Sequence, residues 1–313
     1  MISGLGLGDP ATEGGGAAYV VEELDPADSR AVGDITRVIN AAFGSAVAWD
    51  HVLATTESHS LVAPTLYLGA RCEGELVGLA LFISHDLLYN GAIVNGFQVS
   101  TACTVPAHRN RRVFFRICER AKELLRARGA GLLFSFGRIT RPAFLGPLGF
   151  RDGGGYVKLN IKAVPGLFHR SFRPFREDET LLLEDTYCQN DRQLVRLRQQ
   201  VSRREIAVFA DDGNVVWGKV ERRTVAGLPM RLFSVGGLVV NYPHRLRCSI
   251  AGLVRAHHVQ VVQLVAHQSA PILTLFRGWR AAPAVDRLVM FDLNRRTGPD
   301  DRLNFMIGLK DDY

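Results

Sequence analysis

The sequence predicts an α/β protein that is a degenerate tandem repeat of one α/β unit, and two observations support this. First, a predicted hairpin, strand, helix and buried strand follow one another in the same order in each half of the chain. Second, short matches fall at equivalent points of the two halves, Val77-Gly78 with Trp217-Gly218 and Gly149-Phe150-Arg151 with Gly278-Trp279-Arg280. The 313 residues are enough for two domains of ordinary size.

The first half begins with a Gly-rich stretch, residues 1–16, which we expect to be flexible. A domain over residues 17–163 follows. Its helix at 112–128 has the strongest signal, because one side is apolar and Gly129 stands where a C-cap glycine belongs. The other expected elements are a strand at 17–24, a helix at 26–43, a hairpin at 66–71 and 76–84, and strands at 92–105, 131–136 and 156–161.

A stretch rich in Pro and Phe, residues 164–174, predicts a linker to a second domain over 175–313. The pattern then returns in a weaker form. The expected elements are a helix at 191–201, a hairpin at 206–210 and 215–220, a strand at 230–240, a helix at 243–256 and strands at 259–265 and 288–293.

The charge balance favours anionic ligands. The formal net charge is +7, and Arg clearly outnumbers Lys. Phosphorylated small molecules and nucleic acids both fit this charge. The chain has no stripe of basic and aromatic residues and no zinc-finger spacing, so we expect no specific nucleic-acid binding.

Cysteine and histidine usage points to a reduced, metal-free protein. The five cysteines are scattered and form no C-x-x-C pair, which is typical of a reducing compartment. His257 and His258 are neighbours with no supporting carboxylate or Cys, so we expect no metal site there or at His267. Without a signal peptide or an apolar run of membrane-spanning length, the chain is expected to be cytoplasmic.

A basic turn between a strand and a helix is the most informative feature. The apolar strand runs into Pro106, arginines follow, and Val113 opens the helix. A helix N-terminus attracts anions through its backbone N–H groups and its dipole. The alternative is a solvated basic helix start, but Arg109, Arg111 and Arg112 would then oppose the helix dipole without an anion.

This order of elements resembles the GNAT superfamily of acyl-CoA-dependent N-acyltransferases, well over residues 17–163 and faintly over 175–295. The resemblance implies tandem domains, each a mixed, mostly antiparallel twisted sheet flanked by helices. Family members bind acyl-CoA between two splayed strands, with the pyrophosphate on a turn of type Arg/Gln-x-x-Gly-x-Gly/Ala. The equivalent positions here are Arg109, Asn110, Arg111, Arg112, Val113 and Phe114, preceded by Cys103, Thr104 and Val105 along the pantetheine.

The sequence departs from the family at functional positions. Arg112 and Phe114 stand where glycines are expected, and Leu145 replaces the tyrosine of Tyr-x-x-Leu-Gly-Phe that often protonates the leaving thiolate. Tyr89 and Tyr156 are the nearest tyrosines that could take its place, although each could be purely structural. His85, followed by Asp86, could act as a base, or could simply end a hairpin.

The resemblance implies an acyltransferase that uses acetyl-CoA or a longer acyl-CoA as co-substrate. The acceptor would be an amine of a small metabolite, a sugar or a nucleotide sugar, and a homodimer is left open. The departures from the family motif motivate an alternative, a non-catalytic GNAT-fold protein that binds a phosphorylated ligand or a protein partner.

Overall fold

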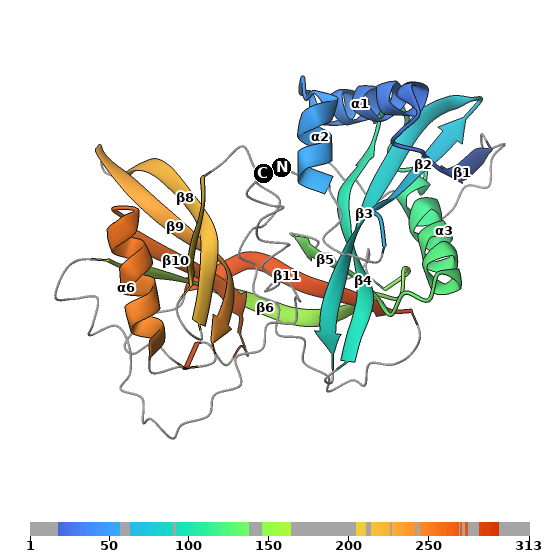
Figure 1. Ribbon diagram of the computed structural model, residues 1–313. Coiled ribbons are helices and arrows are strands. Elements are labelled where there is room, and N and C mark those ends of the chain that lie inside the picture. Colours follow the sequence, from blue (N-terminus) through green and yellow to red (C-terminus); the bar gives the residue numbers. More distant parts are fainter. Residues whose placement is uncertain are drawn as a thin grey trace. The chain divides into compact units, whose positions relative to one another are not determined.

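The computed structural model describes residues 18–56, 63–89, 92–137, 146–163, 205–210, 214–225, 227–240, 242, 245–268, 270, 273–274 and 282–293 (Figure 1). The chain divides into two compact units. Unit 1 comprises Met1–Asp86, Val94–Asp152 and Val289–Pro299, and unit 2 comprises Leu87–Ile93, Gly153–Leu288 and Asp300–Tyr313.

Unit 1 is a mixed sheet with helices on both faces. Its elements are β1 (Tyr19–Glu23), α1 (Ser29–Phe43), α2 (Trp49–Thr56), β2 (Leu66–Cys72), β3 (Glu75–Tyr89), β4 (Ala92–Thr104), α3 (Val113–Ala127) and β5 (Leu132–Gly137). Their strand order is β1-β2-β3-β4-β5. The pairs β1–β2 and β2–β3 are antiparallel, whereas β4 and β5 are parallel.

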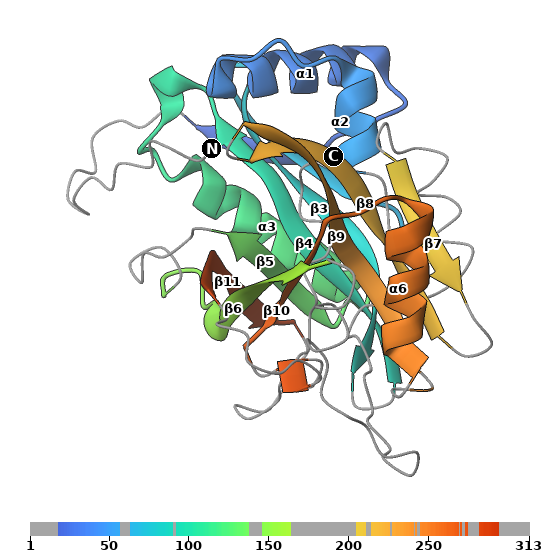
Figure 2. The same cartoon turned by 90° about the vertical axis from the view of Figure 1, so that its left-hand side faces the viewer.

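The helix α3 lies along one face of this sheet (Figure 2). Its apolar residues recur every three or four positions and are almost fully buried against β2–β5, namely Val113, Ile117, Ala121 and Leu125. Gly129, with φ +75°, turns the chain out of the helix and into β5, where a side chain would be strained. The opposite face is covered by α1 and α2 through Ile35, Val38, Ile39 and Val52.

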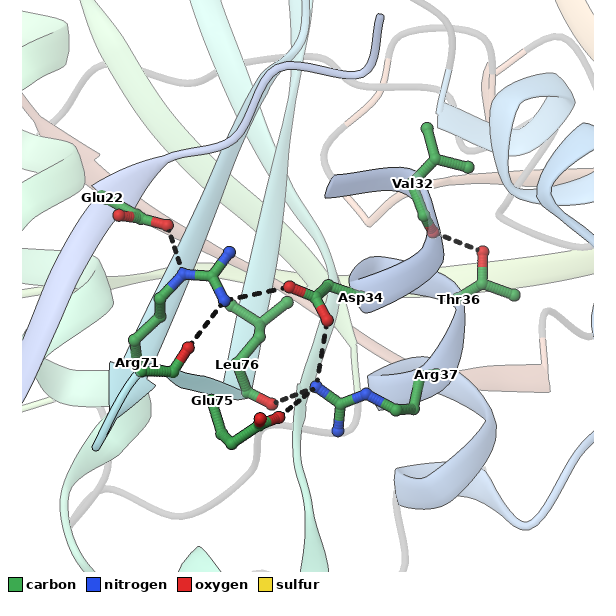
Figure 3. A network of polar contacts seen from close by, with 9 residues as sticks. Glu22, Val32, Asp34, Thr36, Arg37, Arg71, Glu75 and Leu76 are labelled. Atoms are coloured by element: carbon green, nitrogen blue, oxygen red, sulfur yellow. Dashed lines mark hydrogen bonds and ion pairs between the residues drawn. The ribbon is translucent and has the colours of Figure 1, made fainter. Parts of the chain in front are cut away.

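Local caps fix the limits of α1. The carboxylate of Asp28 accepts a hydrogen bond from the backbone N–H of Arg30 at 2.9 Å, and Gly44 adopts the left-handed conformation at the C-terminus. Inside the helix, Asp34 faces the hairpin of β2 and β3 and joins a network of charges there (Figure 3).

That network ties three elements of unit 1 together. Arg71 of β2 bonds Glu22 of β1 at 2.6 Å and Asp34 of α1 at 2.9 Å. Arg37 bonds Asp34 at 3.3 Å and the carbonyl of Leu76 at 3.1 Å. Because one guanidinium bridges two carboxylates, the edge strand, the helix and the hairpin hold a fixed register (Figure 3).

Unit 2 repeats the same order of elements. Its strands are β6 (Arg151–Lys162), β7 (Glu205–Ala210), β8 (Asn214–Val225), β9 (Leu228–Val240), β10 (Val261–His267) and β11 (Ala282–Asp292), with the helix α6 (Leu246–Ala256). The hairpin β7–β8 and the strand β9 are antiparallel, and β9 and β10 are parallel, as β4 and β5 are in unit 1. The predicted fold class, tandem α/β units with mixed, mostly antiparallel sheets, is confirmed.

In each half of the sequence, the strand that follows the parallel pair belongs wholly or partly to the unit formed by the other half. We call this the exchange of β6 and β11. β6 follows β5 in the chain, yet its residues from Gly153 belong to unit 2, where it pairs with β10 in antiparallel register over Tyr156–Lys162. β11 follows β10, yet its end from Val289 belongs to unit 1, where β11 neighbours β5. The sequence pattern predicts both strands but not this exchange.

Several predicted features lie outside the described residues. They are the Gly-rich stretch at 1–16, the linker at 164–174, the helix at 191–201 and the match at Gly278-Trp279-Arg280. The domain boundaries at 163 and 175 therefore stay predictions.

Candidate functional site

The parallel strands β4 and β5 part in the middle of the sheet. Their register covers Gly96–Gln98 against Leu132–Phe134. At the next position the Ser135 hydroxyl donates a hydrogen bond to the carbonyl of Val99 at 3.3 Å. β4 continues beyond that register to Thr104. Thr101, in this last part of β4, has φ +45°, which marks an irregular strand. β4 therefore extends beyond the residues that are in register with β5, as binding of an extended ligand along its edge requires.

The other edge of β4 is held firmly. The N–H of Val105 donates to the carbonyl of Val77 in β3 at 2.9 Å. A Cβ at Gly78 would lie 2.6 Å from a methyl carbon of Val113 and 3.3 Å from the Thr104 hydroxyl. The start of α3 is thus packed directly on the backbone of β3, and the end of β4 is fixed beside it.

A tight turn links β4 to α3. Pro106–His108 form one turn of 3₁₀-helix, and Asn110 and Arg112 follow with φ +64° and +57°. The left-handed conformation of Arg112 explains why a glycine would be favoured at this position, since it costs a residue with a side chain about 1–2 kcal/mol. With Arg112 in this conformation, the first turn of α3 begins at Val113, directly after the basic residues.

Arg109 fastens this turn to the rest of unit 1. Its Nε donates to the carbonyl of Thr104 at 3.3 Å and its Nη2 donates to the carbonyl of Ala42 at 2.8 Å. These bonds connect the turn to the end of β4 and to the end of α1. The predicted contact of Arg109 with phosphate stays a prediction, and the structure gives its side chain a holding role.

The exposed cations of this turn are Arg111 and Arg112. Asn110 separates them from Arg109. Arg112 makes no side-chain capping bond at the start of α3. The backbone N–H groups in the first turn of an α-helix have no intrahelical partner and point toward the helix start. Two exposed guanidinium groups beside these N–H groups form an arrangement that suits a phosphate or pyrophosphate.

His108 packs against the edge of unit 1. Its Nδ1 lies 3.0 Å from the hydroxyl of Tyr19 in β1, and the two rings meet edge to face. The guanidinium of Arg116 lies 5.8 Å from the centroid of the same tyrosine ring. Tyr19 therefore holds the outer side of the turn.

The predicted catalytic residues fall in different parts of the chain. His85 in β3 is 2% exposed, and its ring lies 5.5 Å from that of Phe134, the last residue of β5 in register with β4. Tyr156 of β6 belongs to unit 2 and packs edge to face on His267. Tyr89 is the last residue of β3, and its side chain lies outside the described part. The catalytic role of all three stays a prediction.

Cys103 near the end of β4 is buried beside α1. Burial raises the pKa of its thiol to about 12, although Arg109 and a backbone hydrogen bond from Leu79 act in the opposite direction. The side chain is therefore a neutral thiol at pH 7, which excludes it as a ready nucleophile. Cys103 can take part in a donor site through its backbone.

The comparisons with known proteins fall on this same region. Residues 23–152 match the family model described as an acetyltransferase (GNAT) domain. This part of the chain is a GNAT domain. It contains the parted strands, the basic turn and α3, together with the predicted base His85. Comparison with curated proteins gives no significant match.

Solved structures with similar folds extend the likeness over both units. Eis1 from Mycobacterium abscessus has a TM-score of 0.59 at 17% identity, over 88% of this chain and 74% of that one. A GCN5-related N-acetyltransferase from Anabaena variabilis has a TM-score of 0.62 at 9% identity, over 88% and 73%. A GCN5-related N-acetyltransferase from Kribbella flavida has a TM-score of 0.55 at 16% identity, over 88% and 71%. At these identities the likeness concerns the fold.

The GNAT domain departs from the usual motif in ways the structure explains in part. Arg112 occupies the left-handed position that a motif glycine would take, and Phe114 is half-buried beside the α3 core. Leu145, which replaces the usual tyrosine, lies outside the described residues. Sequence reasoning missed Ser135 and Phe134, which mark the parting of the strands. The alternation Phe134-Ser135-Phe136 in a buried strand was the signal that could have found them.

The described residues contain neither a cluster of metal-ligating side chains nor a membrane-spanning helix. Within the part of the chain that the structure describes, no three side chains of metal-ligating type cluster together. His267, considered above as a ligand, instead has its Nε2 2.8 Å from the carbonyl of Gly153. None of the described helices combines the length and the apolar character needed to cross a membrane.

Proposed function

We propose that the GNAT domain binds acyl-CoA and transfers its acyl group, in the first instance acetyl, to an amine of a small metabolite or sugar. The observation that carries this proposal is the edge of β4, which leaves the register of β5 after Gln98 and leads straight to the basic turn before α3. A thin pantetheine arm can pair with such an edge, while its phosphates reach the helix start. The family match over residues 23–152 supports the same assignment.

Donor binding relies on two kinds of group. The backbone of β4 up to Thr104 and Val105 offers N–H and C=O groups to the amides of pantetheine. The side chains of Arg111 and Arg112 bind the phosphates. A glycine at position 112 would let a phosphate approach the backbone closely, whereas the side chain of Arg112 occupies that space. Arg109 keeps the turn in place for both.

The reaction has a simple balance of bonds and protons. The neutral amine attacks the carbonyl carbon of the thioester, a C–N bond forms and the C–S bond breaks. A base takes one proton from the amine nitrogen, and the departing thiolate receives a proton. Backbone N–H groups of β4 beyond its register with β5 are suited to stabilise the oxyanion that forms in between.

His85 is the proposed base, because its ring packs on Phe134 at the point where the strands part. A neutral imidazole can accept the proton of the incoming amine. Tyr89 and Tyr156 are the proposed alternatives for the acid that protonates the thiolate. Replacing each tyrosine with Phe would separate them, since only the acid's loss lowers kcat without a change in donor affinity.

The proposal is tested by binding first and turnover second. We expect acetyl-CoA, or a longer acyl-CoA, to raise the thermal midpoint, because a ligand that binds only the native state stabilises it. Release of the free CoA thiol with a panel of amines and amino sugars would then identify the acceptor class. The absence of any thermal shift across several acyl-CoAs at millimolar concentration would contradict the proposal.

A non-catalytic role is the second candidate, and Arg112 is the observation that favours it. A side chain at the usual glycine position fills space that a pyrophosphate would take. Such a protein would bind a phosphorylated ligand or a protein partner without turnover. Loss of partner binding in an Arg111→Ala, Arg112→Ala double variant, in a protein with no affinity for acyl-CoA, would favour this second role.

A further inference from the structure

An aromatic side chain from the end of the chain packs under α3 of the GNAT domain. Phe291 lies in β11, in the stretch from Val289 that belongs to unit 1. The ammonium nitrogen of Lys122 lies 4.5 Å from its ring centroid, and the guanidinium carbon of Arg126 lies 5.3 Å from it. Both cations belong to α3, so one ring contacts the helix through two attractive cation–π interactions.

Lys122 makes this contact unusually strong, because its side chain is only 5% exposed. Its ammonium group donates to Glu119 at 2.5 Å and to the carbonyl of Leu148 at 2.7 Å. A buried charge is costly unless all its partners are in place. The face of Phe291 is one of those partners, and it comes from a segment more than 160 residues away in the chain.

Backbone contacts secure the same segment. The N–H of Leu293 donates to the carbonyl of Gly131 at 3.1 Å, and Arg126 donates to the carbonyl of Leu293 at 3.2 Å. Leu293 is buried in the core that α3 shares with the sheet. The end of β11 is therefore part of the surface on which α3 packs.

Gly149 and Phe150 pack against the ring of Phe291. Gly149 has φ +69°, and a Cβ there would lie 3.1 Å from the edge of Phe291. The ring of Phe150 lies 5.9 Å from that of Phe291. The glycine thus allows the chain to pass closely over an aromatic residue that arrives from the C-terminal part of the sequence.

We propose that Phe291 is a positioning residue for the acyl-donor site, and this inference rests on the function proposed above. α3 is a rigid rod, and its first residue lies nine positions, or about 13 Å, from Lys122. A change in how the second half of α3 sits is therefore transmitted to its first turn, where Arg111 and Arg112 meet the donor. Misplacement by about 1 Å is enough to cost a large factor in a positioned site.

A complete donor site therefore needs the end of β11, which belongs to unit 1 but lies in the C-terminal part of the sequence. Residues 23–152 supply the turn and α3, but Phe291 fixes where α3 sits. In this respect the place of the end of β11 in unit 1 is a functional feature as well as a topological one.

The test compares full-length variants at Phe291. Phe291→Leu keeps an apolar side chain but removes the ring, and Phe291→Tyr keeps the ring. We expect Phe291→Leu to weaken acetyl-CoA binding about tenfold in calorimetry and to raise the donor KM, with the acceptor KM unchanged. Phe291→Tyr should stay close to the wild type. Ile250→Val, in the core of unit 2, is the control for a loss of stability alone and should leave donor affinity unchanged.

Arg126→Met provides a second variant in case Phe291→Leu folds poorly, because it removes one cation from the ring and keeps the aliphatic stem. It should weaken the donor by a smaller factor. If the wild type binds acetyl-CoA and both Phe291→Leu and Arg126→Met bind it equally well, the positioning role is wrong. If the wild type itself does not bind acyl-CoA, the proposed function fails first, and this inference fails with it.

Discussion

The guanidinium of Arg109 donates a hydrogen bond to the carbonyl of Ala42 over 2.8 Å and so joins the basic turn to the end of α1. The same side chain reaches the carbonyl of Thr104 at the end of β4. Arg111 and Arg112 stand two and three residues further on and are exposed. Neighbouring arginines of one motif therefore have different tasks, since the first holds the turn and the other two face the ligand.

This division predicts opposite phenotypes for Arg109→Ala and Arg111→Ala. Arg109→Ala leaves two carbonyls without their donor, so we expect a loss of about 1–3 kcal/mol in the free energy of unfolding. Arg111→Ala should leave stability unchanged and weaken acyl-CoA binding by about five- to tenfold, more strongly at low salt. Denaturant unfolding and calorimetry on the two variants separate the roles. Equal stability of both would refute the holding role of Arg109.

The sequence predicted the elements of this region well because their signals are local. The helix expected at 112–128 is α3 at Val113–Ala127, and its limits follow from apolar spacing and Gly129. α2 was missed, because eight residues with little apolar periodicity give no clear pattern. The task of Arg109 could not be predicted, since its partner Ala42 is 67 residues away in the sequence.

The exchange of β6 and β11 was out of reach for the same reason. An alternating apolar pattern indicates a strand but carries no information on its neighbour in the sheet. Gly149 could be recognised as a motif glycine from the sequence. The reason for it, the approach of Phe291, depends on a contact that only the folded chain makes.

Arg112 offers a test in which stability and binding move in opposite directions. Arg112→Gly removes a side chain from a left-handed position, and we expect a gain of about 1 kcal/mol in the free energy of unfolding. Acyl-CoA affinity should fall if the guanidinium binds phosphate. Arg112→Ala is the matched control, because it loses the charge but keeps the strain. A rise in donor affinity with glycine would instead show that the arginine blocks the pyrophosphate.

Asp34 predicts how the stability of unit 1 depends on pH. Burial acts to raise the pKa of this carboxyl, but hydrogen bonds from Arg71 and Arg37 and their charges outweigh it, so the pKa lies below its usual 3.8. A depressed pKa means that the network's contribution is present above the unfolded pKa and is lost as the pH falls through the folded value.

The corresponding experiment compares wild type and Asp34→Asn from pH 7 to pH 2. We expect the variant to be less stable by roughly 1–2 kcal/mol at pH 7, and the difference should shrink below about pH 4. Glu75→Gln is the control, since Glu75 is 76% exposed and its pair with Arg37 is 3.4 Å long, and it should change stability by less than about 0.5 kcal/mol. A difference that stays constant with pH would show that Asp34 acts through shape and not through its charge.

Gly78 provides the most direct test of the link between β3 and the donor site. A methyl group there would meet the Val113 side chain at 2.6 Å, and Val113 is buried and cannot move aside. Gly78→Ala must therefore push the first turn of α3 away from the sheet, at a cost of about 1–3 kcal/mol. Because the same turn contains the groups that meet phosphate, acyl-CoA affinity should fall together with stability.

Gly33→Ala is the control, at an exposed position inside α1 with nothing within 4 Å. It should instead raise the free energy of unfolding by about 0.5–1 kcal/mol and leave binding unchanged. Donor affinity that survives in a destabilised Gly78→Ala variant would place the acyl donor away from the start of α3.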